Sequence, residues 1–76
     1  MGQFDRITFN VNIMGGQACI RGMRITVSLI LNLLANGMTP KEIMNEYPDI
    51  EEEDTKQALR YAAWLATEKV FLNVAV

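Results

Sequence analysis

The tetrapeptide Thr39-Pro40-Lys41-Glu42 restricts the fold of this chain more than any other stretch of the sequence. Thr39 is a good N-cap, proline is favoured at the first helical position, and Glu42 completes a capping box with Thr39. We therefore predict a helix that starts at Pro40. It ends before Pro48, because the residue that precedes a proline disfavours helical backbone angles.

An apolar helix is predicted before this one, from Val27 onward. Thr26 is its expected N-cap and Gly37 its expected C-terminal stop. Ser28, Asn32 and Asn36 leave only a narrow polar stripe. The apolar positions cover most of the circumference: Val27, Ile30, Leu31, Leu33 and Leu34. Such a helix is expected to be buried on several sides.

A third helix is predicted to start within the acidic run 49–54 and to end near Lys69, since acids suit the first turn of a helix. Its capping pair is Asp49 with Glu52 or Glu51 with Asp54, and the sequence does not separate these alternatives. A smooth apolar face is expected from Ala58, Leu59, Ala62, Leu65 and Ala66. The opposite side is expected to carry Glu53, Lys56, Gln57, Arg60, Trp64 and Thr67.

The first 26 residues predict a small β-arm. Residues 7–9 are β-prone, Gly15 and Gly16 interrupt the chain, and Gly22 permits the positive φ of a hairpin tip. Cys19-Ile20 and Ile25-Thr26 are the expected strands on either side of that tip. The stretch from Gly15 to Gly22 matches neither glycine-rich phosphate-binding motif, so a hairpin that carries exposed arginines is favoured.

These elements predict one mainly helical domain with three parts. Residues 1–26 form the arm, residues 27–69 a three-helix core, and residues 70–76 an apolar, β-prone tail that can pair with the arm of its own chain or of a partner. The short connection between the second and third helices is typical of a helix-turn-helix. A generic small helical bundle has the same spacing, and both interpretations stay open at this point.

Composition excludes several functions. The chain has 76 residues, half of them apolar, and a net charge of −2, whereas strong non-specific nucleic-acid binders are usually basic. Histidine is absent, so no catalytic triad or metal site is expected, and we predict a non-enzyme without cofactors. The single cysteine, Cys19, is expected to be a small buried hydrophobe. Because no signal peptide or membrane-spanning run is recognisable, we expect a cytoplasmic location.

The candidate binding residues fall into two groups. Arg6, Arg21 and Arg24 can contact DNA phosphates, and the last two can instead contact a partner's carboxylates. The candidates for a protein interface are Arg60, Tyr61, Trp64 and Phe71, because tryptophan and arginine dominate binding hot spots. Trp64 can alternatively lie flat on Arg60 as part of the fold.

The motifs GGxxxIRGxRI, GMTPxEI and YPxIxxED, carried by residues 15–25, 37–43 and 47–54, resemble the small bacterial domain-of-unknown-function family four-three-three. The resemblance runs from Arg6 to Glu68. It implies a homeodomain-like three-helix core that follows a β-arm. It also implies a VapB-type antitoxin, which binds and silences a small PIN-like nuclease encoded beside it. Gln17 and Glu51 replace a common lysine and a capping threonine, and both changes weaken the case for DNA binding.

The function predicted from the sequence is therefore that of an antitoxin that binds and inhibits a PIN-like ribonuclease and represses its own operon by binding operator DNA. The alternatives are a dimeric helix-turn-helix regulator without a toxin partner and a homodimer of purely structural role. A homodimer is expected in each case.

Overall fold

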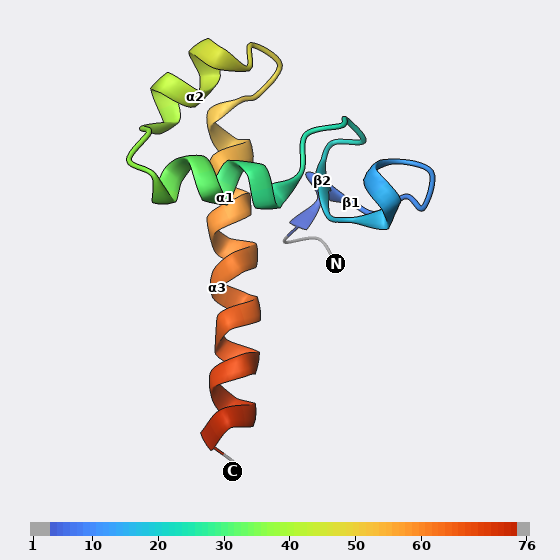
Figure 1. The fold of residues 1–76 in the computed structure, drawn as a ribbon, viewed down its shortest axis with the longest axis vertical. Helices are drawn as coiled ribbons and strands as arrows, with labels where there is room; N and C mark the ends of the chain where they lie inside the picture. The colour runs from blue at the N-terminus through green and yellow to red at the C-terminus, as the bar shows by residue number, and fades with distance from the viewer. Residues whose placement is uncertain (1–3, 75–76) are drawn as a thin grey trace.

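The structure, a computed structural model, describes residues 4–74 of the backbone and the side chains of residues 4–67. Two short strands, β1 (Ile7–Thr8) and β2 (Cys19–Ile20), flank a 3-10 turn, η2 (Met14–Gly16). The helices are α1 (Val27–Ala35), α2 (Pro40–Glu46) and α3 (Glu52–Val74). The expected mainly helical fold with three helices and an N-terminal antiparallel arm is confirmed for these residues. In Figure 1 the arm, α1 and α2 surround the first half of α3, and the second half projects away from them.

The β-arm has backbone pairing on both sides of Cys19. β1 and β2 are antiparallel, with Ile7 opposite Ile20 and Thr8 opposite Cys19. On its other side Cys19 forms a bridge with Thr26. The predicted hairpin between residues 19–20 and 25–26 is thus present as this bridge, while the longer pairing is with β1. Cys19 is buried, with 1% of its surface exposed, as expected for a small core residue.

A tight turn closes the tip of the arm at residues 20–23. The N–H of Met23 donates to the carbonyl of Ile20 at 2.8 Å. Arg21 and Gly22 both have positive φ, 45° and 73°, which is the pattern of a type I′ turn. Gly22 takes this conformation freely, whereas Arg21 bears a steric cost that the surrounding contacts must offset.

Helix α1 begins and ends where the sequence predicts. The Thr26 hydroxyl accepts from the N–H of Leu29 at 3.0 Å. At the other end, Gly37 has a φ of 96° and the N–H of Met38 donates to the carbonyl of Leu33 at 3.1 Å, which forms a Schellman ending. Val27 and Ile30 are fully buried. The expectation of burial on several sides is wrong for this single chain: its remaining leucines, Leu29, Leu31, Leu33 and Leu34, are only partly buried.

The capping box of α2 is confirmed. The Thr39 hydroxyl accepts from the N–H of Glu42 at 3.2 Å, and the Glu42 carboxylate accepts from the N–H of Thr39 at 2.8 Å. The helix ends at Glu46, just before the predicted limit. Its one buried residue, Ile43, enters the core.

Helix α3 is longer than predicted, and its buried face is different. It runs for 23 residues to Val74, so the β-prone interpretation of residues 70–74 is wrong: these residues extend the helix. Gln57 was expected on the outer side but is buried, and Leu59 was expected on the apolar face but is 49% exposed. The reason is that the arm covers the Asp54–Gln57–Tyr61 side of the helix, which the spacing of apolar residues alone does not reveal.

The core lies where the arm, α1, α2 and the first half of α3 meet. Each fully buried isoleucine there contributes about 1.5–3 kcal/mol through loss of apolar surface from water. Its members come from every element of the fold: Phe4, Ile7, Ile20, Val27, Ile30, Ile43, Ile50 and Ala58.

Candidate functional site

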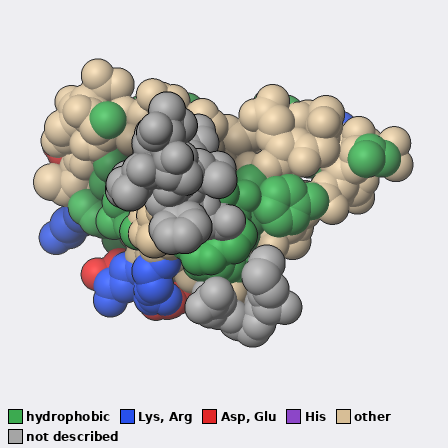
Figure 2. Space-filling view, turned by 90° about the horizontal axis from the view of Figure 1, so that it is seen from below, with side chains coloured by type: hydrophobic (Ala, Val, Ile, Leu, Met, Phe, Trp, Pro, Cys, Tyr) green, Lys and Arg blue, Asp and Glu red, His purple; other side chains and the backbone are tan. Residues whose placement is uncertain are grey.

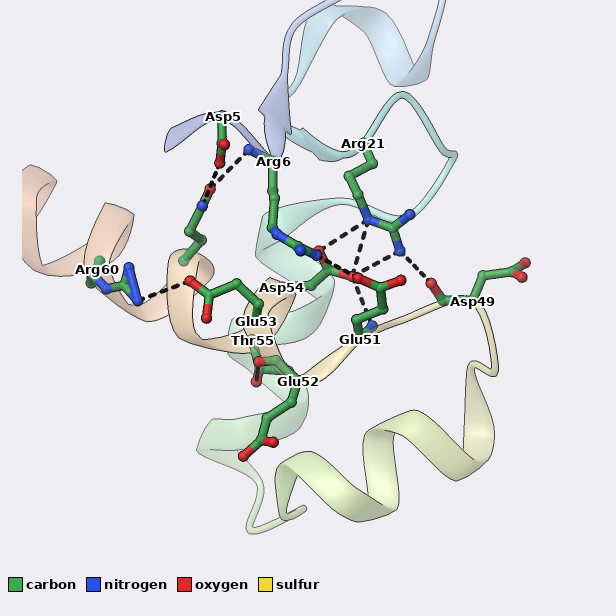
Figure 3. Close-up of polar contacts among 11 residues, drawn as sticks. Asp5, Arg6, Arg21, Asp49, Glu51, Glu52, Glu53, Asp54, Thr55 and Arg60 are labelled. Atoms are coloured by element: carbon green, nitrogen blue, oxygen red, sulfur yellow. Dashed lines mark hydrogen bonds and ion pairs between the residues drawn. The ribbon is translucent and has the colours of Figure 1, made fainter. Parts of the chain in front are cut away.

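A buried carboxylate joins the arm to α3 (Figure 3). The Asp54 side chain has no exposed surface and lies in the first turn of α3. Arg21 approaches it with two nitrogens, at 3.1 Å from Nε to Oδ1 and 3.0 Å from Nη2 to Oδ2. Arg6 donates from Nη1 to Oδ1 at 3.0 Å and to Glu51 Oε1 at 2.7 Å. Two cations from the arm therefore share one carboxylate of the helix.

The same carboxylate also caps α3. Asp54 Oδ2 accepts from the N–H of Glu51 at 2.8 Å. Of the two predicted capping pairs, Glu51 with Asp54 is therefore the one present, with the Asp54 carboxylate as the acceptor. The Glu51 carboxylate meanwhile binds Arg6, so it makes no cap of its own.

The electrostatics of this cluster oppose the cost of burial. Burial alone would raise the pKa of Asp54, but hydrogen bonds from Arg21, the Glu51 backbone and Arg6 outweigh it and lower the pKa below the ordinary value. The bonds to Glu51 and Asp54 raise the pKa of Arg6, and those to Asp54 raise the pKa of Arg21. Asp54, Arg6 and Arg21 therefore stay charged at neutral pH.

This geometry bears directly on the predicted DNA-contact residues. Arg6 and Arg21 direct their guanidinium groups at Asp54 and Glu51, and Arg21 also donates to the carbonyl of Asp49. Arg24, the third candidate, is exposed. The structure therefore uses two of the three arginines to hold the arm on α3.

Gln57 completes the link between the arm and α3. Its Nε2 donates to Asp5 Oδ1 at 2.7 Å, and its Oε1 accepts from the N–H of Arg6 at 2.9 Å. Our sequence reasoning did not select Gln57 or Asp54 as buried contacts. A signal for Asp54 was present, because it lies one helical turn before Ala58 on the predicted apolar face.

An aromatic cluster covers the next turns of α3. Phe4 meets Tyr61 edge to face at 5.4 Å between ring centroids, and it also lies 5.9 Å from Trp64. Phe9 lies 6.3 Å from Tyr61. Trp64 remains 39% exposed and Phe9 59% exposed. We call these four residues the aromatic patch.

The predicted interface residues are thus partly brought together. Tyr61 and Trp64 belong to the aromatic patch, whereas Arg60 pairs with Glu53 at 3.1 Å. Trp64 packs on Phe4 and Tyr61, and this arrangement differs from the alternative in which it lies on Arg60. The side chain of Phe71 lies outside the described residues. Figure 2, seen from the free end of α3, shows hydrophobic side chains close to the helix and charged side chains gathered at one edge.

An apolar groove borders the aromatic patch on α3, and Tyr61 belongs to both. It has a volume of about 490 Å³ and lies between the start of α1 and the middle of α3. Gln17 and Ala18 of the arm and Ser28 of α1 are among its lining residues. Its apolar walls are Val27, Leu31, Tyr61, Ala62, Leu65 and Ala66.

No group of three or more His, Cys, Asp or Glu side chains among the described residues is arranged to hold a metal ion. No helix in the described part of the chain has the length and apolar character needed to cross a membrane.

A three-helix core that carries an ion-paired β-arm and exposed apolar surface on its last helix defines a small, mainly helical domain. The chain belongs to the family described as "Protein of unknown function (DUF433)", which matches residues 7–62. A crystal structure of a member of this family from Anabaena variabilis ATCC 29413 is similar, with a TM-score of 0.75 and 29% sequence identity. The similarity covers 95% of this chain and 70% of that chain. No curated protein matches the sequence.

Proposed function

We propose that this protein is the antitoxin of a toxin–antitoxin pair and that it binds and inhibits a small PIN-like ribonuclease in the cytoplasm. The aromatic patch is the observation that carries the binding role. Trp64 and Phe9 leave large apolar surfaces exposed on a rigid platform made by Phe4 and Tyr61. Exposed aromatic side chains fixed by their neighbours are typical anchors of protein interfaces. The identity of the partner as a nuclease comes from the family resemblance alone.

The charges favour a protein partner over DNA as the principal ligand. In a helix-turn-helix, the start of the third helix meets base edges in the major groove. Here that position holds Glu51, Glu52 and Glu53, which phosphates repel. Two cations near this position, Arg6 and Arg21, already pair with Asp54 and Glu51. Repression of the operon through Arg24 and the helix-turn-helix is therefore the second candidate function.

The proposed role requires no catalysis by this chain. Inhibition follows from covering the surface of the nuclease, so exposed apolar area matters and a nucleophile does not. The exposed part of the aromatic patch can be buried only against a partner. Its removal from water would supply favourable free energy of binding.

The test starts with purification of the tagged protein from its own host. We expect a stoichiometric small nuclease to accompany it and to regain ribonuclease activity when released. The dissociation constant is then measured for Trp64→Ala and for Leu59→Ala, a matched control with exposed apolar surface outside the patch. Trp64→Ala is expected to weaken the complex by about 2 kcal/mol, roughly 30-fold, while Leu59→Ala leaves it unchanged.

Two results would contradict the proposal. Recovery of operator DNA without any protein partner would establish the regulator instead. An equal loss of affinity in both variants would remove the aromatic patch as the binding surface, even if a nuclease is the partner.

A further inference from the structure

The ion-paired cluster between the arm and α3 has a buried half and an exposed half. Asp54 is the buried half: its side chain has no exposed surface, accepts from both arginines and caps the N–H of Glu51. The Glu51 side chain is the exposed half, since it is 59% exposed and, among the residues described, bonds only to Arg6. Asp54 therefore holds the arm on α3, whereas the Glu51 carboxylate adds a contact on the solvent side.

The charges of the cluster explain why an anion lies on that side (Figure 3). Arg6 Nη1 and Arg21 Nε both donate to Oδ1 of Asp54, at 3.0 and 3.1 Å, so the two guanidinium groups lie close together. Two cations on one buried carboxylate leave an excess of one positive charge. The Glu51 carboxylate, 2.7 Å from Arg6 Nη1, supplies the matching negative charge. The arginine pair thus offers a position for an anion, which the chain fills with its own side chain.

We propose that the Arg6–Arg21 pair binds a phosphate group of the DNA backbone, and that Glu51 inhibits this binding by occupying the phosphate position on Arg6. A guanidinium group binds carboxylates and phosphates through the same donors, so one of these anions can replace the other. DNA must then displace the Glu51 side chain before the arm can contact it. The inference rests on the second candidate function, DNA binding, and is independent of nuclease binding at the aromatic patch.

Glu51 can be displaced without loss of the fold. Exposed ion pairs contribute little to stability, and Arg6 keeps its bond to the buried Asp54. The backbone N–H of Glu51 stays capped by Asp54 when the Glu51 side chain moves away. The side chains of Arg6 and Arg21 are 28% and 33% exposed, so a phosphate can reach both from the solvent.

The neighbouring acid Glu52 shows what is particular to Glu51. Glu52 is also exposed and also repels phosphates, but within residues 4–67 its carboxylate pairs with no arginine. Neutralisation of Glu52 therefore only removes a repulsion. Neutralisation of Glu51 removes a similar repulsion and also makes a cation available, which adds a phosphate contact.

The experiment compares Glu51→Gln with Glu52→Gln, which makes the same change in charge one residue away. Binding of a fluorescently labelled DNA duplex of mixed sequence is measured by anisotropy over a series of sodium chloride concentrations. At low salt Glu51→Gln is expected to bind about tenfold more tightly than Glu52→Gln. Its affinity should also fall more steeply with salt, by about 0.9 in the logarithmic slope, because one more phosphate is neutralised. Circular dichroism checks that both variants keep their helices.

Equal affinities and slopes in the two variants would mean that only net charge matters and would overturn the proposal. Undetectable DNA binding by Glu51→Gln would overturn it as well. The double variant Arg6→Gln with Glu51→Gln is expected to lose the added slope, and a slope that stays steep would refute Arg6 as the phosphate ligand. Nuclease binding is tested separately with Trp64→Ala, so the failure of either proposal can be recognised without the other.

Discussion

Arg21 and Asp54 are 33 residues apart in the sequence, yet they form a two-pronged ion pair that fixes the tip of the arm on the first turn of α3. Arg21 makes this contact from a left-handed backbone position, with a φ of 45°. A residue with a side chain is unfavourable there, so the ion pair and the turn bond of Met23 must offset the strain. Ion pairs and hydrogen bonds, as well as apolar packing, therefore hold the arm on α3.

Replacement of Asp54 by asparagine is expected to destabilise the fold by about 3 kcal/mol. The change removes the charge that Arg6 and Arg21 share, and breaking a buried ion pair typically costs about 3–5 kcal/mol. The lower end applies because both arginines keep some access to water. Urea unfolding measures the effect. Glu52→Gln, an exposed acid in the same helical turn, is the control and is expected to change stability by less than about 0.5 kcal/mol.

Acid is expected to unfold the protein through Asp54. Its pKa is lower in the folded state than in the unfolded state, so the ion pairs stabilise the fold fully above the unfolded pKa of about 3.9. That stabilisation is lost as the pH falls through the folded pKa, because the unfolded state then binds more protons. Thermal unfolding measured from pH 7 to pH 2 should show a steep fall below about pH 4. In Asp54→Asn the fall should be shallower, and an unchanged slope would exclude Asp54 as its source.

Gly22→Ala is expected to destabilise the arm by about 1–2 kcal/mol. Nothing lies within 4 Å of a Cβ at this position, so the cost arises from the φ of 73° alone. Gly22→Asn is the informative partner variant, since asparagine tolerates left-handed angles and should lose less. Equal losses in the two variants would mean that the backbone angle is not the cause.

Removal of the cap on α2 is expected to cost about 1 kcal/mol. Thr39→Ala deletes the hydroxyl that accepts from the N–H of Glu42. Thr39→Ser keeps that acceptor and should be close to the wild type in chemical denaturation. A loss in Thr39→Ser as large as in Thr39→Ala would assign the effect to the methyl group instead of the cap.

Local chemistry was sufficient to predict most helix boundaries. Thr26, Gly37 and the pair Thr39–Glu42 act through hydrogen bonds within a few residues, so their effect is visible in the sequence. The glycine at the arm tip was predictable for the same reason, since a positive φ is a local requirement. Ile7–Thr8 and Cys19–Ile20 were recognisable as β-prone, although their pairing with each other was not.

The candidate site was only partly predictable. Tyr61 and Trp64 were selected because aromatic residues concentrate at interfaces, and the structure groups them with Phe4 and Phe9. Arg6 and Arg21 were selected as free cations, and the fold pairs them with Asp54. The spacing of apolar residues shows which face of a helix is apolar. It does not show that cations far away in the sequence, here Arg6 and Arg21, stabilise a buried acid such as Asp54.

The sequence by itself therefore determined the elements, their caps and the turn at Gly22, because each depends on interactions between near neighbours. Tertiary structure decided the face that α3 buries, the extension of that helix to Val74, and the pairing of Arg6 and Arg21 with Asp54. The physical reason is that burial of Asp54 and Gln57 depends on partners about 30–50 residues away in the chain, which meet them only after the arm has docked.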